Sequence, residues 1–131
     1  MHLQPETGFR ESYRIEGETL ITVNDYTSGR LFDDAISYAF YPVDLHTKSG
    51  VRPKPLKPGK VPTIPLSALI PKGSRNIIVA GRCVSSDRLA NSGLRVQASC
   101  MGMGQAAGVA ATLAAKAGTT PLDVPLTEIH A

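Results

Sequence analysis

The sequence predicts a mixed α/β fold, with a short β-sheet and one long helix rich in glycine and alanine. Residues 76–81 form a β-branched apolar run without alternation, which is typical of a strand buried on both faces of a parallel sheet. Residues 97–117 predict the helix, since no charged residue occurs from Val96 to Ala115 and small residues recur at helical spacing. With 131 residues, 42% of them apolar, the chain is long enough for one modest compact unit and too short for two.

The first third of the chain predicts short elements. Residues 9–23 indicate a pair of strands, because β-forming side chains flank a Glu-Gly-Glu turn. Thr22 or Asn24 is suited to cap a helical turn at residues 25–29. Two further elements are expected, a brief helix at 32–39 and a strand at 40–45.

Residues 47–65 contain five prolines and two glycines, which exclude a regular helix and predict a surface loop. This loop divides the chain into a first segment, 1–65, and a second segment, 66–131. The expected elements after it are a short strand or helical turn at 64–70, a turn at 71–73, and a helix start with Thr120 as cap and Pro121 at the first position.

The long helix carries a stripe of small side chains along one face: Cys100, Gly104, Gly108, Ala111 and Ala115. A glycine inside a helix costs about 1 kcal/mol relative to alanine, so we expect a partner backbone or a flat ligand to approach closely there. Few large aliphatic side chains are present, so we expect a buried helix of a soluble protein and not a membrane span.

The formal net charge of +3 is mild, and it excludes few classes of partner. The basic residues gather only in the proline-rich loop, without aromatic side chains between them, so no nucleic-acid site is expected. The first residues do not resemble a signal peptide, and we expect a cytoplasmic location. Cys83 and Cys100 match no zinc or redox motif and are expected to be free, buried thiols, with a disulfide, metal site or redox pair as alternatives.

Three segments together resemble the C-terminal portion of a family of FAD-dependent oxidoreductases. They read FRESYRIEGE (9–18), YPVDLH (41–46) and IPLSALIPKGSRNIIVAGRCVSSDRLANSGLRVQASCMGMGQAAGVAATLAAKAG (64–118). The resemblance covers nearly the whole chain in order. It implies the glutathione-reductase-like plan with two dinucleotide-binding domains, in which residues 1–65 lie on the substrate side and residues 66–131 belong to the FAD-binding domain.

Cofactor contacts are expected after the predicted strand, because ligands of doubly wound sheets lie beyond the carboxyl ends of the strands. Gly81 allows the backbone to approach a ligand, and Arg82 offers a guanidinium for a phosphate or ribityl chain. Arg95 precedes the long helix, whose N-terminus presents amide groups and partial positive charge. The resemblance implies that this helix start faces the flavin ring, with five residues nearby: Cys100, Met101, Gly102, Gln105 and Ala106. Alternatively, Met101 and Met103 only fill core space.

Substrate contacts are expected from Arg10, Arg14 and His46, which the resemblance places on the substrate side. His46 is also a candidate for proton transfer. In the alternative interpretation, both arginines pair with Glu11 or Glu16, and His46 is an ordinary loop residue.

No Gly-x-Gly-x-x-Gly motif follows a predicted strand, although the resembling family carries one for the FAD pyrophosphate. We therefore expect one rim of a cofactor site, an N-terminal Rossmann half as partner, and weak or no FAD binding and no catalysis by this chain alone. The alternative is a non-catalytic α/β module that self-associates or binds a partner through its small-residue helix face. A small phosphate-binding module is a third interpretation. The sequence predicts no metal site.

Overall fold

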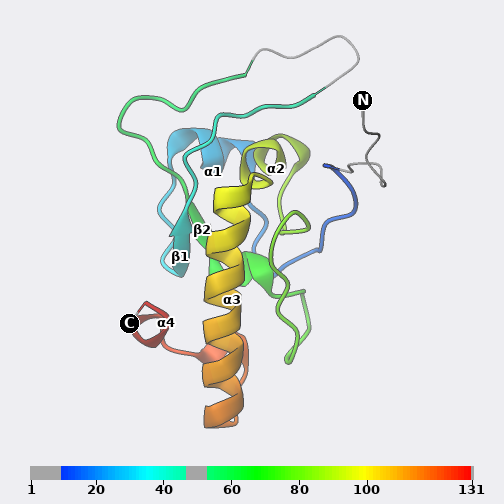
Figure 1. The fold of residues 1–131 in the computed structure, drawn as a ribbon, viewed down its shortest axis with the longest axis vertical. Coiled ribbons are helices and arrows are strands. Elements are labelled where there is room, and N and C mark those ends of the chain that lie inside the picture. The colour runs from blue at the N-terminus through cyan, green and yellow to red at the C-terminus, as the bar shows by residue number, and fades with distance from the viewer. Residues whose placement is uncertain (1–9, 47–52, 131) are drawn as a thin grey trace, which may run out of the picture.

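The computed structural model describes residues 10–46 and 53–130, which form a small mixed fold (Figure 1). The four α-helices of this part are α1 (Val23–Ser28), α2 (Arg88–Leu94), α3 (Gln97–Ala117) and α4 (Leu126–Ile129). Two strands, β1 (Ala35–Tyr38) and β2 (Thr63–Pro65), pair as an antiparallel sheet, and 3-10 turns follow at η1 (Leu66–Leu69) and η2 (Pro121–Asp123). The predicted combination of a short sheet with one long helix is confirmed.

Helix α3 runs along the long axis of the molecule (Figure 1) and has the bounds predicted from the sequence. It ends at Gly118, whose φ of 65° is left-handed and suits glycine. Its buried side chains lie at helical spacing on one face: Ser99, Met103, Ala106, Ala107, Ala110 and Ala114. The predicted stripe of small residues is largely on the opposite side, where Gly104 and Gly108 are exposed.

The close approach expected at the helix glycines occurs at Gly102. A Cβ atom there would overlap the Ser37 hydroxyl of β1 and lie 3.3 Å from the Ser37 Cβ. At Gly104 and Gly108, apart from the adjoining residues and the nearby backbone of α3 itself, no atom of the described chain lies within 4 Å of the Cβ position. The short sheet therefore packs on α3 near Gly102, and the outer glycines face no part of the described chain.

The predictions of a helix at 32–39 and a strand at 40–45 are wrong. Residues 35–38 form β1, which pairs with β2 in the register Ala35–Pro65, Ser37–Ile64 and Tyr38–Thr63. Residues 40–45 contribute only an isolated bridge between Val43 and Lys54. The hydrogen bonds of β1 come from a segment more than twenty residues away, and local propensity carries no information about such a partner.

The strands predicted at 76–81 and 9–23 are also wrong where the structure describes them. Residues 76–80 are irregular and Ile77 is 55% exposed. Val79 N–H donates to Leu69 C=O at 2.8 Å. A strand requires a series of such backbone hydrogen bonds to a neighbouring strand, and a single bond does not form one. In the N-terminal segment, Gly17 and Ile21 form single bridges to distant residues and not to each other; residue 9 lies outside the described residues.

Two aspartates fix the starts of the short helices. Thr22 caps α1 as predicted, in a capping box with Asp25. Asp87 caps α2, a helix that the sequence analysis did not predict, by accepting a hydrogen bond from Ala90 N–H at 2.8 Å. Its second oxygen accepts from Val23 N–H at 2.6 Å, so Asp87 also holds α1 against α2.

The later part of the chain follows its predictions more closely. Residues 64–70 become the end of β2 and η1, and the turn at 71–73 closes with Ser74 N–H donating to Pro71 C=O at 2.9 Å. Thr120 precedes η2 with Pro121 at its first position, as predicted, although this helix is a single 3-10 turn. Of the loop predicted at 47–65, residues 47–52 lie outside the described residues.

Tyr26 lies at the centre of the larger apolar cluster and is fully buried. Its hydroxyl donates to Tyr41 C=O at 2.7 Å. Gly93 of α2 packs on its ring, because a Cβ atom at Gly93 would lie 2.6 Å from the Tyr26 Cζ. A second cluster joins Leu66 to the buried alanines of α3 and to Ile129. Across the described residues, we find no helix with the length and apolar character of a membrane span.

Candidate functional site

A cleft of about 240 Å³, which we call the arginine cleft, opens at the start of α3. It is lined by Arg10, Tyr41, Asp44, His46, Arg82, Ser92, Arg95, Val96 and Gln97. Four of these were singled out from the sequence: Arg10, His46, Arg82 and Arg95. They come from separate stretches of the chain, and the fold brings them together.

Arg95 holds the cleft in shape. It follows the last residue of α2, and its backbone N–H donates to Asn91 C=O at 2.9 Å. Its guanidinium donates through Nη1 to Arg10 C=O and through Nη2 to Asp44 C=O, both at 3.2 Å. Arg95 therefore ties two distant segments to the junction between α2 and α3.

His46 lies between a cation and an anion. Its Nε2 is 3.3 Å from Arg10 Nη1 and 3.2 Å from Asp44 Oδ2. Asp44 is itself fixed, because its backbone N–H donates to Ser92 Oγ at 3.0 Å, and that hydroxyl donates to Leu89 C=O at 2.6 Å. The sequence analysis missed Asp44 and Ser92; the YPVDLH segment contained Asp44, but only its histidine was considered.

Gly81 and Arg82 lie in a loop that a hydrogen bond from the buried Asn91 side chain fixes in place. Asn91, 2% exposed, donates through Nδ2 to Arg82 C=O at 3.1 Å and to Ser86 Oγ at 3.2 Å. Gly81 has a φ of 100°, and apart from its own two chain neighbours no atom of the described residues lies within 4 Å of its Cβ position. Its backbone is thus open to a close approach by a ligand, as the sequence predicts for a cofactor contact.

The start of α3 adds positive potential to the cleft. Its N-cap residue is Val96, which makes no side-chain capping bond, and the first turn contains no acidic residue. The first amide groups of a helix have no partner within the helix and carry partial positive charge. With three arginines and a single carboxylate in its lining, the cleft favours an anionic or electron-rich ligand.

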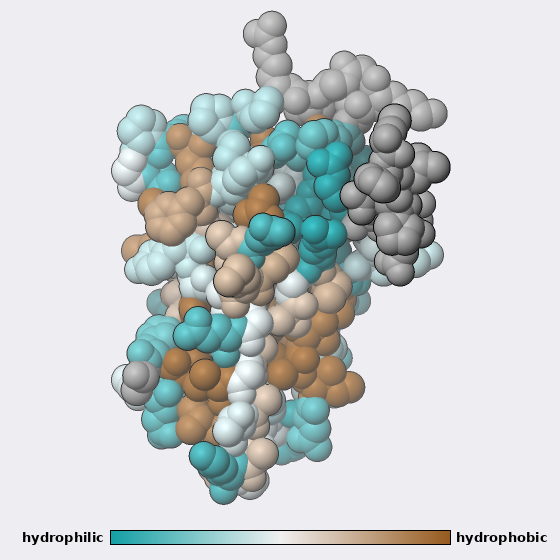
Figure 2. Space-filling view, in the orientation of Figure 1, coloured by the Kyte–Doolittle hydropathy of each residue, from teal (hydrophilic) through white to brown (hydrophobic). Residues whose placement is uncertain are grey.

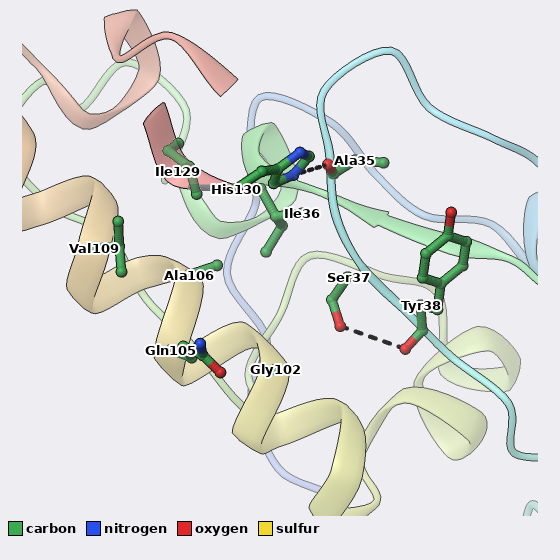
Figure 3. Close-up of a pocket in the computed structure, with 10 residues that line it drawn as sticks. All are labelled: Ala35, Ile36, Ser37, Tyr38, Gly102, Gln105, Ala106, Val109, Ile129 and His130. Carbon is green, nitrogen blue, oxygen red and sulfur yellow. Dashed lines mark hydrogen bonds between the residues drawn. The ribbon is translucent and has the colours of Figure 1, made fainter. Parts of the chain in front are cut away.

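The other predicted flavin contacts lie elsewhere on α3. Gly102, Gln105 and Ala106 line a pocket of about 490 Å³ between β1, α3 and α4 (Figure 3). His130 closes it, with its Nε2 3.0 Å from Ala35 C=O (Figure 3). The structure therefore does not bring these three residues into the arginine cleft, and their contact with a flavin ring remains a prediction.

Met101 and Cys100 differ in exposure. Met101 is 73% exposed, which opposes the alternative that it fills the core, whereas Met103 is fully buried and does so. Cys100 is partly buried against the main apolar cluster. Burial raises the pKa of its thiol; the charge of Arg82 opposes this and Cys83 adds to it. Both cysteines are free thiols, but each is only partly buried, whereas buried thiols were predicted.

Arg14 is not part of the cleft lining. Its Nη1 is 4.0 Å from Glu11 Oε1, and the same oxygen accepts from Arg88 Nε at 2.6 Å. This arrangement favours the interpretation of Arg14 as an ion-pair partner of Glu11. Among the residues that the structure describes, no cluster of histidine, cysteine and carboxylate side chains has the makings of a metal site.

An apolar cavity of about 450 Å³ adjoins the arginine cleft and shares Tyr41 and Val96 with it. Tyr38, Phe40 and Tyr41 form one wall, and Val96, Ala98 and Ser99 of the α3 start lie opposite. This aromatic wall was not predicted, because Tyr38 was assigned to a helix at 32–39, and Phe40 and Tyr41 to a strand at 40–45. Together, the two hollows offer an aromatic surface beside a cationic one.

The arginine cleft thus combines three guanidinium groups and one carboxylate beside a helix start that has no side-chain cap. The family model described as FAD dependent oxidoreductase matches residues 1–131, and the chain belongs to that family. Comparisons with curated proteins and with solved structures gave no significant match.

Proposed function

We propose that the chain forms the flavin- and substrate-facing wall of an FAD-dependent oxidoreductase. The observation that carries this proposal is the start of α3, which lacks a side-chain cap and opens between Arg82 and Arg95. Family membership gives the cofactor, FAD, whose flavin carries out redox chemistry when bound. The proposal therefore concerns the contacts that residues of this chain make with FAD.

Gly81 and Arg82 contact the ribityl and phosphate portion in this proposal. The open side of Gly81 admits the cofactor backbone, and the Arg82 guanidinium supplies positive charge. The amides and dipole of the α3 start stabilise negative charge on the ring, which is electrostatic preorganisation. The aromatic wall at Tyr38 and Tyr41 offers apolar surface beside the ring. Arg10 and His46 then face the substrate.

We further propose that a Rossmann half, not present among these 131 residues, completes the site. The sequence has no Gly-x-Gly-x-x-Gly motif after a strand, so the pyrophosphate lacks its usual helix N-terminus. This chain alone then holds FAD weakly or not at all, and it is inactive.

The test is a visible absorbance spectrum of the purified chain with added FAD, alone and co-expressed with a glycine-rich dinucleotide-binding half. We expect no retained flavin with the chain alone and a flavin spectrum from the complex. Gly81→Val is expected to reduce FAD retention in the complex. Gly73→Val is the matched control, since Gly73 also has a positive φ (73°) and an open Cβ position.

Two results would contradict this proposal. Stoichiometric FAD on the chain alone would show that no second half is needed. Equal FAD retention by the Gly81 and Gly73 variants would remove Gly81 from the flavin site.

A second candidate function is a non-catalytic module that self-associates or binds a partner protein. It is favoured by a shallow groove of about 490 Å³ on the outer face of α3, lined by Gly104, Gly108, Thr112 and neighbouring residues. The spectrum distinguishes the two functions, since an interaction module holds no flavin in either arrangement.

A further inference from the structure

We propose that the arginine cleft binds a small organic carboxylate through Arg10, and that this binding changes the tautomer of His46. The inference rests on the proposed function, in which this cleft is the substrate side of the flavin site. It adds the chemical class of the substrate and the residue that recognises it.

The charge and size of the cleft favour a small acid. Arg10, Arg82 and Arg95 contribute three positive charges to the lining, and Asp44 contributes the one carboxylate. A guanidinium presents its N–H groups in a planar fork that matches the two oxygens of a carboxylate. Pockets for drug-sized ligands usually have volumes of about 300 Å³ or more. The cleft, at about 240 Å³, is smaller and therefore suits a small ligand.

Arg10 is better placed than Arg95 to release its present contact for a ligand. Arg95 holds two backbone carbonyl groups, those of Arg10 and Asp44, so its movement would loosen the cleft. The Arg10 side chain instead contacts a side chain, His46, at 3.3 Å and at an exposed site. It can turn to a bound carboxylate without breaking a backbone hydrogen bond.

The two contacts of His46 are alternatives. Arginine only donates hydrogen bonds and an ionised carboxylate only accepts them. Nε2 must therefore be unprotonated to accept from Arg10 at 3.3 Å, and protonated to donate to Asp44 Oδ2 at 3.2 Å. A ligand that draws Arg10 away removes the donor and leaves Asp44, which favours the Nε2–H form.

This mechanism is measurable without flavin. The full chain, labelled with ¹⁵N in histidine, is titrated at about pH 8 with acetate, succinate or inorganic phosphate. Sodium chloride keeps the ionic strength constant. We expect acetate and succinate to move the His46 ring nitrogens toward the Nε2–H pattern. His130, in the pocket beside β1, serves as an internal reference that should not respond.

Two variants make the test specific. Arg10→Gln removes the guanidinium that donates to His46, so the His46 ring nitrogens are expected to show the Nε2–H pattern before any acid is added and to change little during the carboxylate titration. Arg14→Gln is the matched control, since Arg14 lies four residues along and outside the cleft lining, and it should respond like the original chain. Unchanged His130 signals and circular dichroism verify that Arg10→Gln is folded. If it is not, Arg10→Lys replaces it, and the loss of the guanidinium fork is expected to weaken the response.

The outcomes separate this inference from the proposed function. A response to phosphate but not to carboxylates would overturn the ligand class, and no response of His46 to any of the three would overturn the site. An equal response in Arg10→Gln would remove Arg10 from it. The titration is made without flavin, so none of these results predicts whether the complex retains FAD. Likewise, a complex that fails to retain FAD would not contradict a measured response of His46 to carboxylate.

Discussion

Asp25 shows at the residue scale how one side chain joins local structure to acid stability. Its Oδ2 accepts from Thr22 N–H at 3.0 Å and from the Thr22 hydroxyl at 2.7 Å, and its Oδ1 accepts from Arg30 Nη1 at 2.8 Å. Burial by itself would raise the pKa of Asp25. The hydrogen bonds from Arg30 and Thr22 outweigh that effect and hold the pKa below its ordinary value of 3.8.

The low pKa of Asp25 predicts a pH-dependent contribution to folding. Because the pKa is lower in the folded than in the unfolded chain, the carboxylate stabilises the fold above about pH 4. This stabilisation disappears as the pH falls through the folded-state value. Asp25→Asn should lower the free energy of unfolding by about 1 kcal/mol at neutral pH, as expected for a damaged helix cap, and by less in acid.

Urea unfolding at neutral pH and at about pH 3 measures both values. Asp33→Asn is the matched control, because Asp33 is exposed and lies outside the capping box. Equal losses for Asp25→Asn at both pH values would show that the carboxylate charge does not contribute.

The sequence predicted single functional side chains by their type, and it could not predict their partners. Arg10, His46, Arg82 and Arg95 were identified as candidates, and the structure places them in one cleft. Arg14 was an equal candidate from its residue type, but it lies outside the cleft lining and its Nη1 is 4.0 Å from Glu11 Oε1. Asp44 and Ser92 support the cleft through contacts across 48 residues of sequence, which no local pattern encodes.

At the scale of elements, the long helix was predictable and the strands were not. The bounds of α3 depend on apolar spacing and on Gly118 at its end, which are local features. A strand at 76–81 would need a neighbouring strand to pair with, and the described residues provide none there. β1 forms because it pairs with Thr63 and Ile64 of β2. Sheet pairing is a long-range property, so the sequence of a strand alone did not determine its state.

Gly104 inside α3 and Gly118, the residue that caps its C-terminus, should give opposite results when changed to alanine. Gly104→Ala adds a methyl group into open space within the helix and should raise the free energy of unfolding by up to about 1 kcal/mol. Gly118→Ala forces a left-handed φ of 65° on a residue with a Cβ atom and should lower it by about 1–2 kcal/mol. Urea unfolding of both variants measures the difference. A destabilised Gly104→Ala would mean that something already packs on that face.

At the scale of the whole molecule, apolar surface remains uncovered around α3. Figure 2 shows apolar surface on both sides of the lower part of this helix. Tyr38 is 59% exposed, Phe40 72% and Met101 73%. Exposed apolar patches of this kind commonly mark interaction sites. The two segments predicted on either side of residue 65 are in contact, since Leu66 N–H donates to Asp34 C=O at 2.8 Å.

We predict that the chain alone self-associates through the outer face of α3. Gly104 and Gly108 allow a second backbone to approach there, since nothing lies within 4 Å of their Cβ positions. Light scattering over a range of concentrations should show a rising average mass. Gly104→Gln, which adds bulk without apolar surface, should lower that mass, whereas Gly104→Ala should lower it less. Both substitutions favour the helix, so loss of folding does not explain such a difference. A constant monomer mass at high concentration would contradict self-association and leave the outer face of α3 for a different partner, such as the Rossmann half.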